Sequence, residues 1–281
     1  MFFTNFGRTY RLKGYEIPEG SRTSKGMNVV NILELQPGEK ITSMLRIPEI
    51  EGEEYLCMMT KKGIIKRTPL KDYKNVRRGG LIAINLDEDD ELSWVRLTSG
   101  NDDLLVATRE GMSIRFHETD SRSLGRTARG VKSITFKKPD DEVVGFDVIR
   151  ENATVLTVSE TGYGRRSNPD DYKVQKRGGS GLLNYRVEKY GKVAAIRMVE
   201  DDDDLIMISS DGIIIRIESN TINLVSRPAK GVKVMRINGE ENKLITISTV
   251  KHEDEEELET SETVDAVETN ENVETTEETA E

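Results

Sequence analysis

The residues best placed to do chemistry are basic side chains that recur at fixed positions along the chain. Five times, an arginine stands four residues after a glycine that follows a short apolar run. These arginines are Arg11, Arg67, Arg115, Arg166 and Arg216. Charge needed only for solubility would mix signs at equivalent positions, whereas here one sign recurs. The pattern therefore predicts a row of guanidinium groups along one rim, suited to a polyanion.

A second group of basic residues precedes a second glycine in each of the five places. Its members are Arg22, Lys25, Arg77, Arg78, Arg126, Arg129, Arg177, Arg227 and Lys230. A glycine beside a basic residue lets the backbone approach a phosphate closely and point its amide groups at it. Aromatic residues make up only 5% of the chain, which disfavours base stacking on single strands. We therefore expect both groups to contact phosphates of double-stranded DNA without reading its sequence.

The two sets of glycines define an internal repeat of about 50 residues. The first glycines are Gly7, Gly63, Gly111, Gly162 and Gly212, and the second glycines are Gly26, Gly80, Gly130, Gly181 and Gly231. A period of this length is typical of stacked or radial units. The predicted repeats are residues 1–53, 54–103, 104–153, 154–204 and 205–250.

Each repeat is predicted to form four short strands. In the third repeat these are residues 104–109, 112–116, 130–136 and 142–149, which are rich in β-branched residues and bounded by Gly, Asp and Pro. The first two are expected to pair through a tight turn, and the last two to pair around residues 138–141. Four-stranded units of this length predict an all-β, propeller-like disc of about five blades.

The charge is divided between a basic body and an acidic tail. Residues 251–281 hold 14 acidic residues and one lysine, so the remaining 40 basic and 37 acidic residues give residues 1–250 a net charge of +3. The tail has no aromatic residue and no apolar period, and is predicted to be disordered. Tethered beside a basic rim, it is expected to compete with DNA.

Several kinds of chemistry are disfavoured. No apolar run is long enough to span a membrane, no secretory signal is visible, and the single cysteine, Cys57, excludes a disulfide framework. Two histidines leave no Ser-His-Asp set, and no phosphate-binding G-x-x-x-x-G-K-[ST] loop is present. Residues 201–204, four aspartates, lack the alternating ligands of a calcium loop and are expected to form a solvated turn. No catalytic residue, metal site or cofactor is expected in this chain.

Several of these segments are similar to one known family. The stretches GRTYRLKGYEIPEGSRTSKG (7–26), GIIKRTPLKDY (63–73), ETDSRSLGRTARGVKSI (118–134) and GYGRR (162–166) resemble the C-terminal DNA-wrapping domain of the A subunit of DNA gyrase, in its Gram-positive-type form. The stretch QKRGGSG resembles the Gln-x-Arg-Gly-Gly-x-Gly box of that family, and adds Gln175, Lys176, Gly178, Gly179 and Gly181 to the expected DNA-binding residues. The resemblance covers residues 1–250 and implies a β-pinwheel fold.

The resemblance implies a function at the level of a larger assembly. The family domain binds and wraps DNA and supports ATP-dependent negative supercoiling, an isomerase activity of a cytoplasmic, nucleoid-associated A2B2 complex with the gyrase B protein. Catalysis, ATP and Mg²⁺ belong elsewhere in that complex. The family has six blades, so the first blade, with the principal box, is expected to be missing here. The alternatives are the C-terminal domain of the A subunit of topoisomerase IV, and a protein-interaction propeller of the kelch or regulator-of-condensation type.

Overall fold

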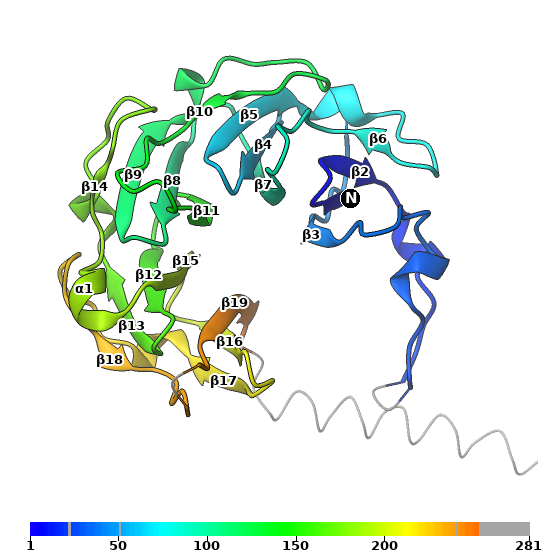
Figure 1. Ribbon diagram of the computed structural model, residues 1–281. Coiled ribbons are helices and arrows are strands. Elements are labelled where there is room, and N and C mark those ends of the chain that lie inside the picture. Colours follow the sequence, from blue (N-terminus) through cyan, green and yellow to red (C-terminus); the bar gives the residue numbers. More distant parts are fainter. Residues whose placement is uncertain (22–23, 51, 240, 253–281) are drawn as a thin grey trace, which may run out of the picture.

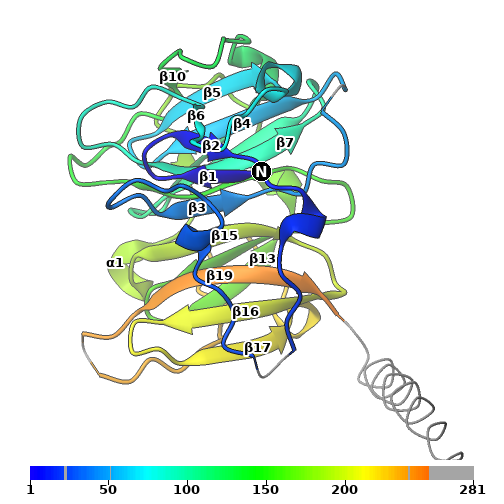
Figure 2. The ribbon, with the colours of Figure 1, turned by 90° about the vertical axis from the view of Figure 1, so that its right-hand side faces the viewer.

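The protein is a ring of five β-sheets that stand around a common centre as blades (Figure 1). The computed structural model describes residues 1–21, 24–50, 52–239 and 241–252. The predicted all-β, propeller-like disc of five blades is confirmed. The ring is open between its first and last blades, which lie one above the other in Figure 2. The acidic tail predicted to be disordered is residues 251–281, but Lys251 ends the last strand and the His252 amide donates to the Asp202 carbonyl, so the prediction is wrong for these two residues. Residues 253–281 lie outside the described residues.

The blades are built from short antiparallel strands. Blade 1 contains β1 (Phe2–Thr4), β2 (Arg8–Tyr10) and β3 (Ile41–Met44), and blade 2 contains β4 (Tyr55–Thr60), β5 (Ile64–Pro69) and β7 (Leu92–Thr98). Blade 3 contains β8 (Asp103–Thr108), β9 (Met112–His117) and β11 (Val143–Val148), blade 4 contains β12 (Thr154–Ser159), β13 (Tyr163–Ser167) and β15 (Val193–Val199), and blade 5 contains β16 (Asp203–Ser209), β17 (Ile214–Glu218) and β19 (Leu244–Lys251).

The outermost strand of each of the first four blades comes from the following repeat. These strands are β6 (Leu81–Ile82), β10 (Val131–Lys132), β14 (Leu182–Leu183) and β18 (Val232–Lys233), which pair with β2, β5, β9 and β13 respectively. Blade 5 has three strands among the described residues. The remaining elements are a single α-helical turn, α1 (Val187–Tyr190), and the 3-10 turns η1 (Gly14–Glu16), η2 (Val29–Asn31), η3 (Leu70–Tyr73), η4 (Glu118–Asp120), η5 (Pro169–Asp171) and η6 (Ser219–Thr221).

This supply of an outer strand by the following repeat, called strand exchange below, shows that the pairing predicted for the third repeat is wrong. The strand expected over residues 130–136 is reduced to β10, and it pairs with β5 of the preceding blade instead of residues 142–149. The latter form β11, which pairs with β8 of their own blade. Period-2 alternation identifies strands but not their partners, and the turn residues at 138–141 favour local pairing in the sequence.

Apart from Gly26 and Gly212, where a Cβ would meet no atom within 4 Å, the glycines of the repeats are the points where consecutive repeats touch. The first glycines accept hydrogen bonds from the segment just after the exchanged strand, as when the Asn184 and Tyr185 amides donate to the Gly111 carbonyl at 2.7 and 3.0 Å. Among the second glycines, Gly130, Gly181 and Gly231 cross the preceding blade so closely that a Cβ would lie 2.1 to 2.6 Å from a backbone carbonyl oxygen, 2.1 Å in the case of Gly231. Both sets have positive φ, where glycine is favoured.

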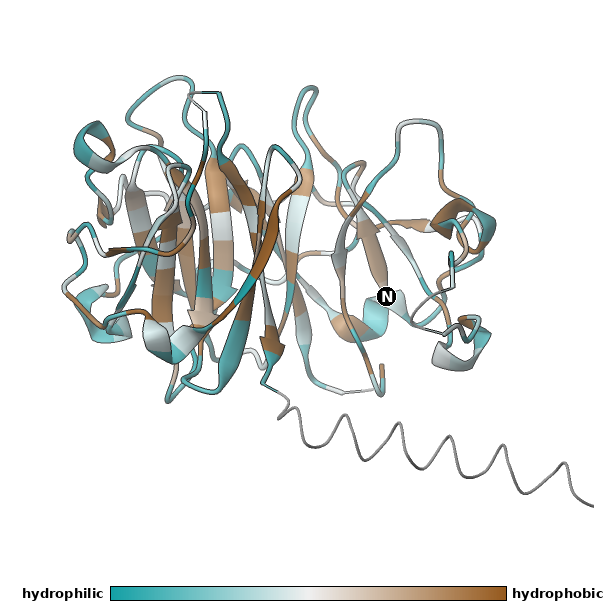
Figure 3. Cartoon of the chain, turned by 90° about the horizontal axis from the view of Figure 1, so that it is seen from below, coloured by the Kyte–Doolittle hydropathy of each residue, from teal (hydrophilic) through white to brown (hydrophobic). Residues whose placement is uncertain are grey.

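The hydrophobic cores lie between neighbouring blades. On β8, Leu104 and Val106 pack against blade 2, whereas Leu105 and Ala107 pack against blade 4. Both faces of β8 are therefore buried, and Figure 3 shows hydrophobic stretches along strands within the ring. Cys57 belongs to one of these cores and is fully buried. None of the described helices is long and apolar enough to cross a membrane.

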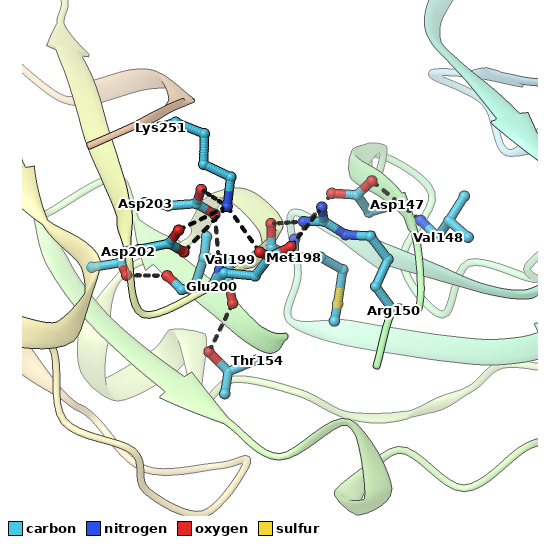
Figure 4. Close-up of polar contacts among 11 residues, drawn as sticks. Asp147, Val148, Arg150, Thr154, Met198, Val199, Glu200, Asp202, Asp203 and Lys251 are labelled. Carbon is cyan, nitrogen blue, oxygen red and sulfur yellow. Dashed lines mark hydrogen bonds and ion pairs between the residues drawn. The ribbon is translucent and has the colours of Figure 1, made fainter. Parts of the chain in front are cut away.

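The inner strands are joined across blades by hydrogen bonds. The first amide of each inner strand from the second blade onward donates to the preceding blade: Leu92 to Asn5, Val143 to Lys61, Val193 to Arg109 and Leu244 to Glu160, at 2.9 to 3.2 Å. Side chains extend the connection: Arg150 of blade 3 and Lys251 of blade 5 both bind Glu200 of blade 4, at 3.1 and 2.8 Å (Figure 4). The inner edge therefore fixes each blade to the next.

Replacing a glycine that crosses the preceding blade by alanine is expected to lower the free energy of unfolding by more than its positive φ alone explains. Gly231→Ala places a Cβ against the Gly164 carbonyl, whereas Gly212→Ala keeps a comparable positive φ with no atom within 4 Å. Positive φ costs an alanine about 1–2 kcal/mol, and the overlap at Gly231 adds about 1–3 kcal/mol more. Denaturant unfolding of the two variants measures the difference, and equal losses of stability would contradict this account of the strand crossing.

Candidate nucleic-acid interface

Apart from Lys25, the described members of the second basic group lie on the connections that lead to the exchanged strands, at the outer edge of the ring (Figure 1). We call residues 124–130, 174–181 and 224–231 the basic loops of the third, fourth and fifth repeats. The exposed members of the group are Lys25, Arg77, Arg78, Arg129 and Lys230, and the half-buried members are Arg126, Arg177 and Arg227. Arg22 lies outside the described residues. Strand exchange thus brings seven predicted site residues from the second to fifth repeats to the perimeter, whereas Lys25 belongs to the first repeat, which supplies no exchanged strand among the described residues.

The basic loops are attached to the preceding blade by backbone hydrogen bonds. The Leu124 amide donates to the Arg67 carbonyl at 2.8 Å, the Gln175 amide to Arg115 at 2.8 Å, and the Val225 amide to Arg166 at 2.9 Å. Each loop then turns and enters its exchanged strand. The position of every basic side chain on these loops is therefore set by two blades.

The box-like loop of the fourth repeat has its own internal support. Arg177 donates from Nε to the Asp120 carbonyl at 2.7 Å and from Nη1 to the Lys132 carbonyl at 3.0 Å. The Gly178 amide, at φ +83°, donates to the Ser133 carbonyl at 2.6 Å. The two contacts of Arg177 hold its guanidinium group in one orientation. Such fixed guanidinium geometry suits a phosphate oxygen, because less side-chain entropy is lost on binding.

The other box residues have distinct surroundings. Lys176 is exposed without a hydrogen-bonded partner among the described residues. Gly179 accepts the Thr135 amide at 2.9 Å, and Gly181 crosses blade 3, where a Cβ would lie 2.2 Å from the Ser113 carbonyl oxygen. Gln175 is half-buried, and its Nε2 has no hydrogen-bond partner in the part of the chain that the structure describes.

The first basic group is placed differently, with its side chains bound to protein groups. Arg67 is buried, lies 3.4 Å from a Glu118 carboxylate oxygen, and stacks 4.5 Å from the Tyr55 ring centroid. Arg166 is also buried and binds Asp201 together with the Ile222 carbonyl, the latter at 2.8 Å. These two guanidinium groups have little surface left for an external phosphate.

The other members of this group repeat the arrangement. Arg115 binds Asp103 at 2.8 Å and the Pro169 carbonyl at 3.0 Å. Arg11 donates to the Lys74 carbonyl at 3.1 Å, and the exposed Arg216 binds Asp204. In four of the five cases the acceptor carbonyl or carboxylate belongs to the following repeat or its boundary. An inter-repeat structural role therefore accounts for the recurring positive charge, and phosphate binding by this group stays a prediction.

The sequence interpretation missed a third set of basic residues on the same perimeter. Arg122 and Lys173 are exposed, each eleven residues after a first glycine, and Lys132 and Lys233 are the exposed second residues of exchanged strands. The recurrence at position eleven was available in the sequence. The outward direction of the exchanged strands was not, because it depends on which blade they join.

The run of aspartates is divided between the turn and the strand. Asp201 and Asp202 are exposed in a turn, as predicted, whereas Asp203 and Asp204 are buried at the start of β16, so the prediction of a fully solvated turn is wrong for them. Lys251 binds Asp202 and Asp203 at 3.1 and 3.2 Å (Figure 4). Within residues 1–252, apart from the few that the structure does not describe, no cluster of three His, Cys, Asp or Glu residues is arranged to hold a metal ion.

The fold and its perimeter define a class of protein: a propeller-like disc, built from exchanged repeats, with basic loops along its rim. Comparison with known sequences narrows the class. The profile of the family described as DNA gyrase C-terminal domain, beta-propeller, matches residues 1–48, 54–99, 102–150, 153–200 and 203–251. The chain belongs to this family. Each matched segment contains the three strands that one repeat contributes to its own blade, and none of the segments is limited to an exchanged strand.

Individual relatives agree with this assignment. The chain is 50% identical over 260 residues to the A subunit of DNA gyrase from Clostridium acetobutylicum, and 44% identical over 263 residues to that from Staphylococcus aureus strain MRSA252. Each alignment covers 92% of this chain but only 31% and 30% of the relative. The chain thus spans about a third of the length of these relatives, and corresponds to their C-terminal part.

Solved structures show the same architecture. A crystal structure of the C-terminal domain of DNA topoisomerase IV superposes with a TM-score of 0.81 at 25% identity, covering 94% of this chain and 83% of that one. A DNA gyrase A C-terminal domain superposes with a TM-score of 0.75 at 25% identity, covering 88% and 80%. The fold is therefore shared by both kinds of topoisomerase domain.

The two kinds of perimeter arginine are expected to respond oppositely to substitution. Arg67→Ala leaves the buried Glu118 carboxylate without its cation, so the free energy of unfolding should fall by about 3 kcal/mol. Arg122→Ala removes an exposed side chain and should change stability by less than about 0.5 kcal/mol. We expect DNA affinity to fall for Arg122→Ala and to be kept by folded Arg67→Ala. Denaturant unfolding and fluorescence anisotropy measure the two effects, and the reverse pattern would make Arg67 a phosphate ligand.

Proposed function

We propose that this chain binds double-stranded DNA without sequence preference along its outer perimeter and bends the DNA around the ring. The observation that carries the proposal is the strand exchange, which brings exposed basic residues from successive repeats onto one curved edge. Duplex DNA carries one charge per about 1.7 Å of axis, so a continuous basic edge meets phosphates at every loop. Repeated contacts of this kind position the duplex and do not read bases.

Bending the duplex requires compensation by these contacts. Smooth bending of 20–30 base pairs by 40–90° costs on the order of 1–6 kcal/mol. Charge-assisted hydrogen bonds from guanidinium groups are about twice as strong as neutral ones, and several basic loops act on the same segment. Arg177, already held by two carbonyls, and the exposed Lys176 beside it are the residues we assign to the strongest contact on the fourth repeat.

At the level of the whole protein, we propose that the chain serves the A subunit of DNA gyrase. In that role it would guide a DNA segment for ATP-dependent negative supercoiling by an A2B2 assembly with the gyrase B protein in the bacterial cytoplasm. Cleavage, ATP hydrolysis and Mg²⁺ binding would reside in other parts of the assembly. Sequence identities of 44% and 50% to gyrase A proteins support this proposal.

The A subunit of topoisomerase IV is the second candidate, because a domain of topoisomerase IV superposes with the higher TM-score, 0.81. The QKRGGSG loop favours gyrase, since degenerate boxes are expected in topoisomerase IV. Negative supercoiling of relaxed plasmid by the full-length protein, reconstituted with its partner and ATP, separates the two. Relaxation and decatenation without supercoiling would support topoisomerase IV.

Binding to a duplex should depend steeply on salt. If about 6–10 cations displace counterions, a plot of log K against log [salt] should have a slope of about −5 to −9, with similar affinities for unrelated sequences. Lys176→Ala should make the slope less negative by about 1. Lys243→Ala removes the same charge from the inner edge, where Lys243 lies beside Leu244 of β19, and should leave the slope unchanged. A flat salt response, or strong preference for one sequence, would refute perimeter binding to phosphates.

The acidic tail should weaken binding at low salt. Residues 253–281 carry 14 acidic and no basic side chains, and the disorder predicted from this composition would give a tether of 29 residues a reach of roughly 30 Å. Truncation after His252 preserves β19 and the contact of His252 with Asp204. We expect higher DNA affinity for the truncated chain, with a gain that shrinks as salt rises. Anisotropy titrations at two salt concentrations test this, and equal affinities at low salt would leave the tail a role in solubility alone.

A further inference from the structure

Two buried cations lie beneath the basic loops and bind no carboxylate of the described residues. Lys66 in β5 and Arg165 in β13 stand three residues after a first glycine, and neither side chain has exposed surface. Their polar partners are carbonyl, amide or hydroxyl oxygens. A fully buried cation without a contacting carboxylate is costly, which makes the pair unusual within a core.

Lys66 connects two successive basic segments. Its ammonium group donates to the carbonyls of Ala83, Gly125 and Arg126, with the Gly125 contact at 3.2 Å. Ala83 lies three residues after the second glycine of its own repeat, directly after the exchanged strand β6. Gly125 and Arg126 belong to the basic loop arriving from the next repeat. Three carbonyls match the three donors of an ammonium group.

Arg165 makes the equivalent connection two blades further on. Its Nη2 donates to the Asn184 carbonyl at 2.5 Å, and its Nε donates to the Ala229 carbonyl at 3.1 Å. Asn184 lies three residues after the second glycine Gly181, as Ala83 does after Gly80. Ala229 immediately precedes Lys230 in the basic loop of the fifth repeat. The same two segments are thus joined by a different cation.

Blade 3, which lies between them, has no cation at the equivalent position. The position equivalent to Lys66 and Arg165 in the third repeat is Ile114, which is buried in an apolar cluster. There the loop is held from its own side, by the Arg177 contacts to Asp120 and Lys132. Every one of the three basic loops is therefore fixed by a cation bound to carbonyls, and two of the cations are inaccessible to DNA.

We propose that Lys66 and Arg165 are positioning residues that fix the basic loops of the third and fifth repeats against the preceding outer connection, and so set where Arg126, Arg129 and Lys230 meet DNA. The DNA part of this inference rests on the proposed function. Burial and the nearby Arg126 charge lower the pKa of Lys66 to about 7, so the fold holds this cation at an electrostatic cost. Asp72 is the acidic group that acts on it from η3, without contacting it, and the Tyr73 hydroxyl shares its Ala83 acceptor at 3.1 Å.

Amide hydrogen exchange of the free protein tests the positioning role. Lys66→Met should speed exchange in residues 124–130 by about tenfold, the effect of losing one or two hydrogen bonds, and leave exchange in residues 224–231 unchanged. Arg165→Met should instead speed exchange in residues 224–231 and leave exchange in residues 124–130 unchanged. Lys62→Met, which removes an exposed lysine from the turn between β4 and β5, should affect neither loop. Lys66→Arg, which installs the cation used by the other blade, should restore slow exchange.

DNA affinity separates the inference from the proposed function. Each Met variant should bind a mixed-sequence duplex about five- to tenfold more weakly at fixed salt, although neither residue can reach DNA. Unchanged exchange in the loop beneath the substituted residue would overturn the positioning role. Faster exchange with unchanged affinity would confirm positioning and refute DNA binding by these loops. If a Met variant does not fold, Lys66→Gln and Arg165→Gln give the same comparison while retaining a polar group that can bind one carbonyl.

Discussion

The close contact between a glycine of one repeat and a backbone carbonyl of the preceding one is the constraint on which the ring depends. An exchanged strand of only two residues can reach its neighbour because Gly130, Gly181 and Gly231 lie almost against a carbonyl group, with room for no Cβ. The first glycines complete the contact by accepting amides from the segment that follows the exchanged strand. Without both contacts, the outer edge of each blade would be unpaired and the basic loops would have no fixed path.

Positive charge in this protein serves two purposes that the sequence alone does not separate. Arg67 and Arg166 are buried within protein contacts, and Lys66 and Arg165 lie deeper still. Arg122, Lys173 and Lys176, by contrast, are exposed on the perimeter. Because a guanidinium or ammonium group can donate to backbone carbonyls as well as to phosphates, recurrence of one charge at one position is compatible with either use. The division emerges only once the partner of each strand is known.

The number of blades and most strands could be predicted from the sequence because they depend on local signals. Residues 104–109 and 112–116 are predicted strands, and β8 and β9 lie within about one residue of those bounds. The destination of residues 130–136 could not be predicted, since pairing within a repeat and pairing with the preceding repeat use the same alternation. Lys66 and Arg165 were equally hidden, because a lysine or arginine in a strand ordinarily points to solvent. Their burial follows from the exchange.

The direction of the exchange gives the chain an order of assembly during synthesis. The β2 strand ends at Tyr10, yet the strand that completes its sheet begins at Leu81. A ribosome must therefore deliver most of the second repeat before the first blade acquires its outer edge, and the same delay applies to each later blade. Bringing such distant segments together costs loop-closure entropy before any contact repays it. Nascent blades consequently pass through a stage with an exposed sheet edge, and that edge is covered from the amino-terminal side toward the carboxy-terminal side, one repeat behind the growing chain.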